Sequence, residues 1–243
     1  MFKLKNIYKK EIINHFSNDS TNIKVDANTS TLVSNIWNKV QKNNDFLYDG
    51  KIYSLVKHEE VGNKFIIYTQ KTNFKYLYVA KLRNDLKKKI NVGGIGILAI
   101  IETSDNKLVL TERATDNMIS LVSGVFNYEN TYQTLEKCIT DELLEELEIP
   151  IKEISTIYPV YLISHLEHSN EFIYYISLKC SSESLKSKNF NFEIKELMFI
   201  DKKYEIIDNF YNQFLNNLNP TVEFLFNELL AFNKGKSEVS FYD

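Results

Sequence analysis

The chain has 243 residues, enough for one large domain or two small ones with a substantial core. Hydrophobic residues make up 44% and aromatic residues 13% of it, which is typical of a globular chain and not of a disordered one. Twenty-nine basic residues face 32 acidic ones, for a net charge of -3, so general nucleic-acid binding through phosphate neutralisation is disfavoured.

The number of cysteines and the composition of the N-terminus indicate the cellular compartment in which we expect the protein. Cys138 and Cys180 are too few for a disulfide framework, which favours a reducing environment. Lysines interrupt residues 1–16 every few positions, unlike a secretory signal peptide, and no apolar run approaches the roughly 18–20 residues of a membrane helix. We therefore expect a cytoplasmic protein with no membrane partner. Only Arg83 and Arg113 carry a guanidinium, the cation suited to bidentate anion binding.

The N-terminal third has two parts that differ in composition and in predicted secondary structure. Residues 1–45 are polar and predict two helical stretches, the second of them capped by Ser30. Residues 46–82 are rich in β-formers and contain a predicted hairpin turn at 61–63. The last part of this region, 74–82, suits a strand or a helix.

A glycine pair within residues 91–94 predicts a domain boundary. We expect a small α+β domain over residues 1–90 and a second domain over residues 91–243. Strands and helices alternate in the second domain, which indicates a mixed α/β or α+β fold. The expected strands are 95–101, 107–111, 157–164, 171–179 and 194–200, and the expected helices are 131–147, 203–217 and 221–233.

The helix over residues 131–147 is the most informative element. Asn130 and Gln133 form a capping-box-like start, and Pro150 follows its end. At about 100° per residue, one face of the helix is apolar. That face contains Leu135, Cys138, Ile139, Leu143 and Leu147.

Three carboxylates fall on or beside that apolar face. Glu142 and Glu146 lie inside the apolar arc and Glu145 lies at its edge. The i, i+3 and i+4 spacing brings them to one patch, where their charges repel each other unless a cation is bound. Oxygen-only ligation of this kind suits Mg²⁺ or Mn²⁺. A solvated acidic face with lysine partners is the alternative, and the placement inside the apolar arc favours the metal.

Residues 124–149 resemble a Nudix box, written G-x5-E-x7-R-E-U-x-E-E-x-G-U with U an apolar residue. The second half of the motif is matched in register by Glu142, Leu143, Glu145, Glu146 and Ile149. The resemblance implies that Glu142, Glu145 and Glu146 are the metal ligands, and that Glu145 and Glu146 serve catalysis through the ion. It also implies a role for the loop at Gly124 in holding the metal and the substrate.

The match departs from the motif at four places. Asp141 stands where the motif has Arg, Glu148 where it has Gly, and Gln133 where it has the early Glu. Gly124 lies three residues too far upstream, so the loop carries an insertion. In the family, the arginine braces the helix against this loop.

The resemblance extends over residues 91–235 and implies an α/β/α sandwich with a mixed sheet. Residues 50–82 also look like the small β-rich domain that precedes the hydrolase domain in nucleotide-sugar-type Nudix proteins. The strand ending at Glu112 and Arg113 points toward the box loop. Arg113 could therefore grip a diphosphate, or pair with Glu112 or Asp116.

A general base is expected from a loop outside the box, as Nudix proteins often supply it. Glu167 and Glu171 are the candidates in the connection SHLEHSNEF. His165 and His168 in the same connection do not converge well enough for zinc, and no cysteine is nearby.

Two functions remain open at this stage. The first is Mg²⁺-dependent hydrolysis of the pyrophosphate bond in a nucleoside diphosphate linked to another moiety, with a nucleotide-sugar-like substrate. The second is a Nudix-fold protein that binds a nucleotide or a protein partner without hydrolysis, consistent with the departures from the motif. The oligomeric state is open, with a homodimer among the options.

Overall fold

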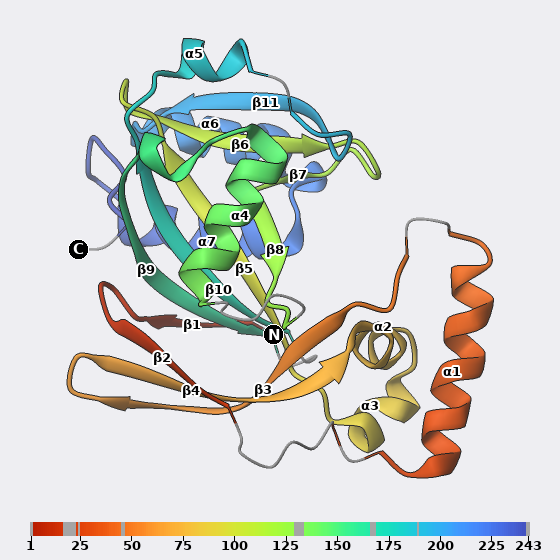
Figure 1. Cartoon of the computed structure of the whole chain (residues 1–243). Coiled ribbons are helices and arrows are strands. Elements are labelled where there is room, and N and C mark those ends of the chain that lie inside the picture. The colour runs from red at the N-terminus through yellow and green to blue at the C-terminus, as the bar shows by residue number, and fades with distance from the viewer. Residues whose placement is uncertain are drawn as a thin grey trace.

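The computed structural model describes residues 2–16, 23, 25–44, 47–128, 134–165, 169–188 and 190–241. One mixed sheet runs through them in the order β1-β9-β10-β5-β3-β4-β2 (Figure 1). β8 and β6 also pair with β5, and β6 pairs with β11 and β7. The strands are β1 (Phe2–Asn6), β2 (Glu11–Phe16), β3 (Lys51–Val61), β4 (Lys64–Asn73), β5 (Gly94–Glu102), β6 (Lys107–Arg113), β7 (Ile119–Ser120), β8 (Val122–Val125), β9 (Ile154–His165), β10 (Ser169–Leu178) and β11 (Ile194–Asp201).

Helices cover both faces of the sheet around β5. Helix α4 (Leu135–Leu147) packs on one face, and α6 (Tyr204–Phe214) and α7 (Pro220–Phe232) pack on the other (Figure 1). β5 is almost wholly buried because both of its faces are covered, which explains its continuous apolar sequence. The result is the expected three-layer α/β/α arrangement with a mixed sheet.

Three further helices form a separate apolar cluster beside the sheet. They are α1 (Ala27–Gln41), α2 (Phe74–Leu82) and α3 (Asn84–Ile90), and they pack around Trp37 (Figure 1). Residues 74–82 are thus a helix, which settles the strand-or-helix alternative. Helix α1 begins earlier than expected, because the side chain of Asp26, and not that of Ser30, caps its first turn. Strands from both sides of residue 90 share one sheet, and the division into two domains stays a prediction.

The first expected helix is wrong, because residues 2–16 form β1 and β2. β1 pairs antiparallel with β9 from Phe2 opposite His165 to Asn6 opposite Tyr161. The ring of Phe2 also lies 5.0 Å from the ring of Phe224 on α7. The alternation of apolar and polar residues in β1 is that of a strand, and β9 supplies its hydrogen-bond partners. Among the described residues, no helix combines the length and the apolar character that crossing a bilayer requires.

Helix α4 begins later than expected. Its N-cap is Thr134, whose hydroxyl accepts a hydrogen bond of 3.0 Å from the backbone N–H of Lys137. The predicted capping box at Asn130 and Gln133 lies outside the described residues, and the helix starts at Leu135. The later start leaves the three glutamates in the body of the helix.

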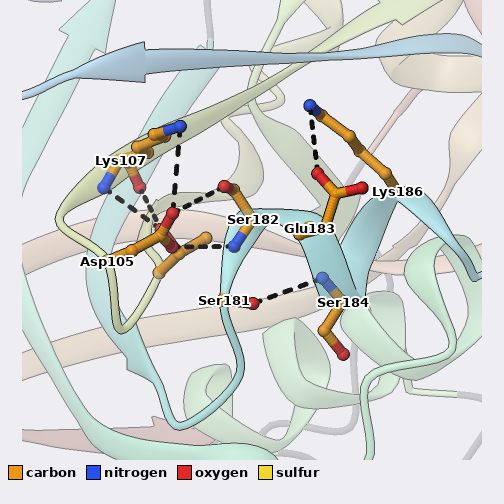
Figure 2. Close-up of polar contacts among 8 residues, drawn as sticks. Asp105, Lys107, Ser181, Ser182, Glu183, Ser184 and Lys186 are labelled. Atoms are coloured by element: carbon orange, nitrogen blue, oxygen red, sulfur yellow. Dashed lines mark hydrogen bonds and ion pairs between the residues drawn. The ribbon is translucent and has the colours of Figure 1, made fainter.

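A polar contact fixes the turn between β5 and β6 against helix α5 (Ser182–Lys186), as Figure 2 shows. The carboxylate of Asp105 accepts hydrogen bonds from the backbone N–H of Ser182 at 2.7 Å and from its hydroxyl at 2.6 Å. These hydrogen bonds hold the pKa of Asp105 well below its usual range. The contact anchors one end of β6, and the other end of that strand carries Arg113.

Candidate active site

The three glutamates of α4 line one cleft of about 390 Å³. A second wall of the cleft is formed by β8 and the residues that follow it, and a third by the segment that leads into β3. The lining residues are Leu47, Tyr48, Gly50, Lys51, Ile52, Phe74, Ser123, Gly124, Val125, Asn127, Glu142, Glu145, Glu146 and Glu193. The cleft therefore brings together the carboxylates of α4, the backbone of β8 at Gly124, and aromatic side chains.

Gly124 lies directly beneath Glu142. A Cβ atom at position 124 would overlap the Cγ, Cδ and Oε1 atoms of Glu142. Gly124 pairs with Ile97 of β5, so the strand cannot withdraw from α4 without breaking the sheet. Glycine is thus the residue that lets the helix approach the strand this closely.

The electrostatics of the cleft disfavour ionised carboxylates. Burial and the charges of Glu145 and Glu193 raise the pKa of Glu142 to about 7. Burial and the charges of Glu142 and Glu193 raise the pKa of Glu146 to about 8, and Arg113 opposes part of this rise. Glu142 and Glu146 are half-buried, whereas Glu145 is exposed at the edge of the cleft.

Glu193 is a carboxylate of this site that the sequence analysis missed. It directly precedes β11 and lines a smaller pocket of about 100 Å³ together with Glu146 and Arg113. Backbone hydrogen bonds hold this segment, from Asn191 N–H to the carbonyl of Glu146 at 3.2 Å and from Ala114 N–H to the carbonyl of Glu193 at 2.8 Å. The motif gave no signal for it, because Glu193 lies outside the box.

Arg113 lies at the end of β6 and faces the same small pocket. Its Nε atom is 3.8 Å from a carboxylate oxygen of Asp116, and its side chain is 45% exposed. The carboxylate of Glu112 instead pairs with Lys195. The guanidinium thus has Asp116 as a loose carboxylate partner, which is one of the expected alternatives, and its contact with a diphosphate stays a prediction.

The two expected base candidates do not join this cleft in the described residues. Glu167 lies outside them. Glu171 belongs to β10, where Phe172 packs in the core on the α4 side and Ile173 packs in the core on the α7 side. Because strand residues alternate, Glu171 faces α7; burial raises the pKa of its carboxyl, and a hydrogen bond from Thr221 of α7 opposes the rise.

The histidines of the same connection give no metal site among the described residues. His165 packs its ring 4.5 Å from the ring of Phe2, and His168 lies outside the description. His165 is therefore part of the β1–β9 contact.

Two residues that depart from the motif, Asp141 and Glu148, lie in the described part of α4 and at its end. Asp141 forms an i,i+4 ion pair of 2.7 Å with Lys137, a contact within the helix itself. Glu148 ends α4 in a left-handed conformation, with φ 52° and ψ 35°, which is the conformation that the glycine of the motif adopts without strain. Gln133 lies outside the described residues.

The donor set fits a hard divalent cation in its chemistry. Glu142, Glu145 and Glu146 supply only oxygen ligands, and their mutual repulsion is what a bound cation would relieve. In the described part of the chain, no three acidic, histidine or cysteine side chains are gathered closely enough to form a closed metal site.

Comparison with known proteins concerns the fold. No protein-family model matches the sequence, and no curated protein matches it. Several solved structures, some of them described as Nudix hydrolases, are similar to the chain in fold. One is a MutT protein from Methanosarcina mazei Go1, with 14% identity, coverage of 58% of this chain and 95% of that one, and a TM-score of 0.40.

Two further structures show the same kind of similarity. A Nudix-family hydrolase from Clostridium perfringens has 15% identity, coverage of 58% and 97%, and a TM-score of 0.41. A bifunctional NMN adenylyltransferase/ADP ribose pyrophosphatase from Francisella tularensis, complexed with AMP and a Mn ion, has 14% identity, coverage of 64% and 47%, and a TM-score of 0.44.

Proposed function

We propose that the protein hydrolyses the pyrophosphate bond of a nucleoside diphosphate linked to another moiety, with Mg²⁺ or Mn²⁺ as cofactor and nucleotide-sugars among the substrates. The observation that carries the proposal is the gathering of Glu142, Glu145 and Glu146 in one cleft over Gly124. Three carboxylates on one helix, two of them with raised pKa values, are costly for the fold unless they bind a cation.

The three glutamates would hold the ion, with the backbone at Gly124 beside them. A bound divalent cation polarises a diphosphate and offsets the charge that develops during phosphoryl transfer. Arg113 would donate hydrogen bonds to the non-bridging phosphate oxygens from the other side of Glu146. These assignments use every charged group that lines the two pockets except Lys51 and Glu193.

Glu193 is our proposed general base. A carboxylate oxygen of Glu193 would take a proton from the attacking water as the water oxygen bonds to phosphorus. The bridging P–O bond then breaks, giving a nucleoside monophosphate and the phosphate ester of the other moiety. Glu167 remains an alternative base outside the described residues, whereas Glu171 faces the other side of the sheet.

A second function is binding without turnover. It is favoured by Asp141, which stands where the motif has Arg and forms an ion pair with Lys137 on its own helix. The substrate or ligand in both proposals is a small molecule, since the net charge gives no cationic face for nucleic acid.

One experiment tests the proposed activity. The full chain is incubated with ADP-ribose and a panel of nucleotide-sugars, with Mg²⁺, with Mn²⁺ or with EDTA, and the nucleoside monophosphate product is measured. We expect metal-dependent product that Glu146→Gln lowers on the order of 10²-fold or more, because the metal acts mainly on transition-state charge. Glu183→Gln, on the distant helix α5, is the matched control. Binding of a panel member with no product from pH 6 to 9 would leave the binding function standing instead.

A further inference from the structure

The wall of the cleft opposite α4 comes from the N-terminal part of the chain. It consists of Leu47, Tyr48, the chain to Ile52, and Phe74 at the start of α2; together with Asn127 we call it the ring wall. We propose that the ring wall binds the nucleobase of the substrate, with Tyr48 stacking on the base and Asn127 accepting a hydrogen bond from its exocyclic amino group. The inference rests on the proposed function and names the part of the substrate that this wall recognises.

The segment that carries Tyr48 is held in place by α2. The carboxylate of Asp49 accepts a hydrogen bond of 3.0 Å from the backbone N–H of Lys75 and forms an ion pair of 3.0 Å with the side-chain ammonium of Lys75. The backbone N–H of Phe74 donates to the carbonyl of Gly50 at 2.8 Å. The backbone next to Tyr48 is therefore held by these contacts, which lowers the entropic cost of ordering Tyr48 around a ligand.

The same segment is joined to the strand that carries Gly124. The backbone N–H of Tyr53 donates to the carbonyl of Phe126 at 2.9 Å, and that of Tyr128 donates to the carbonyl of Lys51 at 3.1 Å. The ring wall and the Gly124 strand are thus one hydrogen-bonded unit. A ligand that reaches from the glutamates to the ring wall meets a surface whose two ends are held at a fixed separation.

Tyr48 has the exposure that a stacking residue needs. It is 68% exposed, although it lines the cleft. Its ring lies against Gly50, where an added Cβ would come within 2.9 Å of Cε2. One face of the ring is thus supported by backbone, and stacking of a nucleobase on an aromatic side chain is tolerant of the identity of the base.

Asn127 adds selectivity. Its side-chain oxygen is buried and has no hydrogen-bond partner among the described residues, although Asn127 lines the cleft. A buried acceptor without a partner is costly, so a ligand donor at this point gains affinity. The exocyclic amino group of adenine or cytosine is such a donor, whereas the carbonyl at the same position of hypoxanthine or uracil is an acceptor.

The test uses ligands that cannot be hydrolysed at a pyrophosphate bond, so it does not depend on catalysis. Binding of AMP, IMP and ribose 5-phosphate to the full chain is measured by titration calorimetry in Mg²⁺ buffer. We expect AMP to bind about tenfold or more tightly than ribose 5-phosphate and more tightly than IMP. Tyr48→Ala should remove most of the first difference and Tyr48→Phe should keep it. Asn127→Ala should remove the preference for AMP over IMP.

Phe232→Ala is the control for the loss of an exposed aromatic side chain, since Phe232 is 52% exposed at the end of α7 and lies outside the cleft. The inference is overturned if AMP and ribose 5-phosphate bind equally, if AMP does not bind at millimolar concentration, or if Tyr48→Ala leaves AMP binding unchanged. If any of these results accompanies hydrolysis that Glu146→Gln abolishes, the ring wall fails and the proposed function stands. If AMP binds as expected but no pyrophosphate substrate is cleaved, the proposed activity fails instead.

Discussion

The carboxylate of Glu142 occupies the space in which residue 124 would carry a Cβ atom. Helix α4 can therefore pack this closely on β8 only because residue 124 is glycine. Gly124→Ala must either push α4 off the sheet or rotate Glu142 out of the cleft. Overpacking of this kind costs on the order of 1–3 kcal/mol of unfolding free energy. We expect a lower melting temperature and a loss of most metal-dependent activity.

A double-mutant cycle checks that cause. If Gly124→Ala acts by displacing Glu142, its effect on activity should largely disappear in a Glu142→Gln background, because the two changes then remove the same contact. Additive losses in the double variant would show that the alanine acts elsewhere.

The raised pKa values predict an unusual pH dependence of stability. Carboxyls whose folded pKa values, about 7 for Glu142 and about 8 for Glu146, exceed their unfolded values stabilise the fold fully only at low pH. Their contribution is lost as the pH rises through these folded values. In EDTA, the melting temperature should therefore fall between about pH 5 and pH 8.

Two measurements check this dependence. Mg²⁺ should raise the melting temperature more at pH 8 than at pH 6, because a cation favours the ionised carboxylates and binds the native state. Glu146→Gln should flatten the EDTA profile and remove most of the metal response. A melting temperature that rises with pH in EDTA would contradict the prediction, since the carboxyls with depressed pKa values, such as Glu60 at about 2, act only in stronger acid.

Glu193→Gln tests the base. A general base contributes typically 10²–10⁴-fold to rate, so the variant should lose kcat by that order while KM for the substrate changes little. Glu196→Gln, three residues further on in β11, serves as control. A Glu193 variant with full kcat would return the role to Glu167.

Glu148 predicts a gain in stability. A non-glycine residue in a left-handed conformation carries strain that glycine lacks, so Glu148→Gly should stabilise the fold by about 0.5–1 kcal/mol. Thermal or denaturant unfolding measures the change. Glu148→Ala removes the same charge but keeps the Cβ, and an equal gain from alanine would attribute the effect to charge.

The sequence predicts some of these features well because they depend on local periodicity. Glu142 and Glu146 share the apolar side of α4 by helical spacing alone, and β5 and β10 are long apolar runs. Glu193 could not be found in this way, because it reaches the cleft through β11, which pairs with β6. Likewise, the alternation of Phe2, Lys3, Leu4 and Lys5 suits a strand, but nothing in the local pattern indicates that its partner is β9, more than 150 residues later.

Sequence patterns give no information on two further features, the position of Tyr48 and the cap of α4. Tyr48 precedes a strand whose contact with the residues after β8 depends on single backbone hydrogen bonds between distant segments, for which sequence patterns give no signal. The spacing of Asn130 and Gln133 predicts a capping box on residues outside the described ones, and the hydroxyl of Thr134 caps the helix that the structure describes.

The pairing of β1 with β9 has a consequence for biosynthesis. Phe2 cannot meet His165 until most of the chain has been made, which at 5–20 residues per second takes about 10–30 s. Until then, Phe2 and Leu4 lack the core they later cover, and afterwards β1 shields the backbone edge of β9. A bulky fusion placed directly before Phe2 should therefore favour aggregation during expression more than the same fusion at the opposite end of the chain.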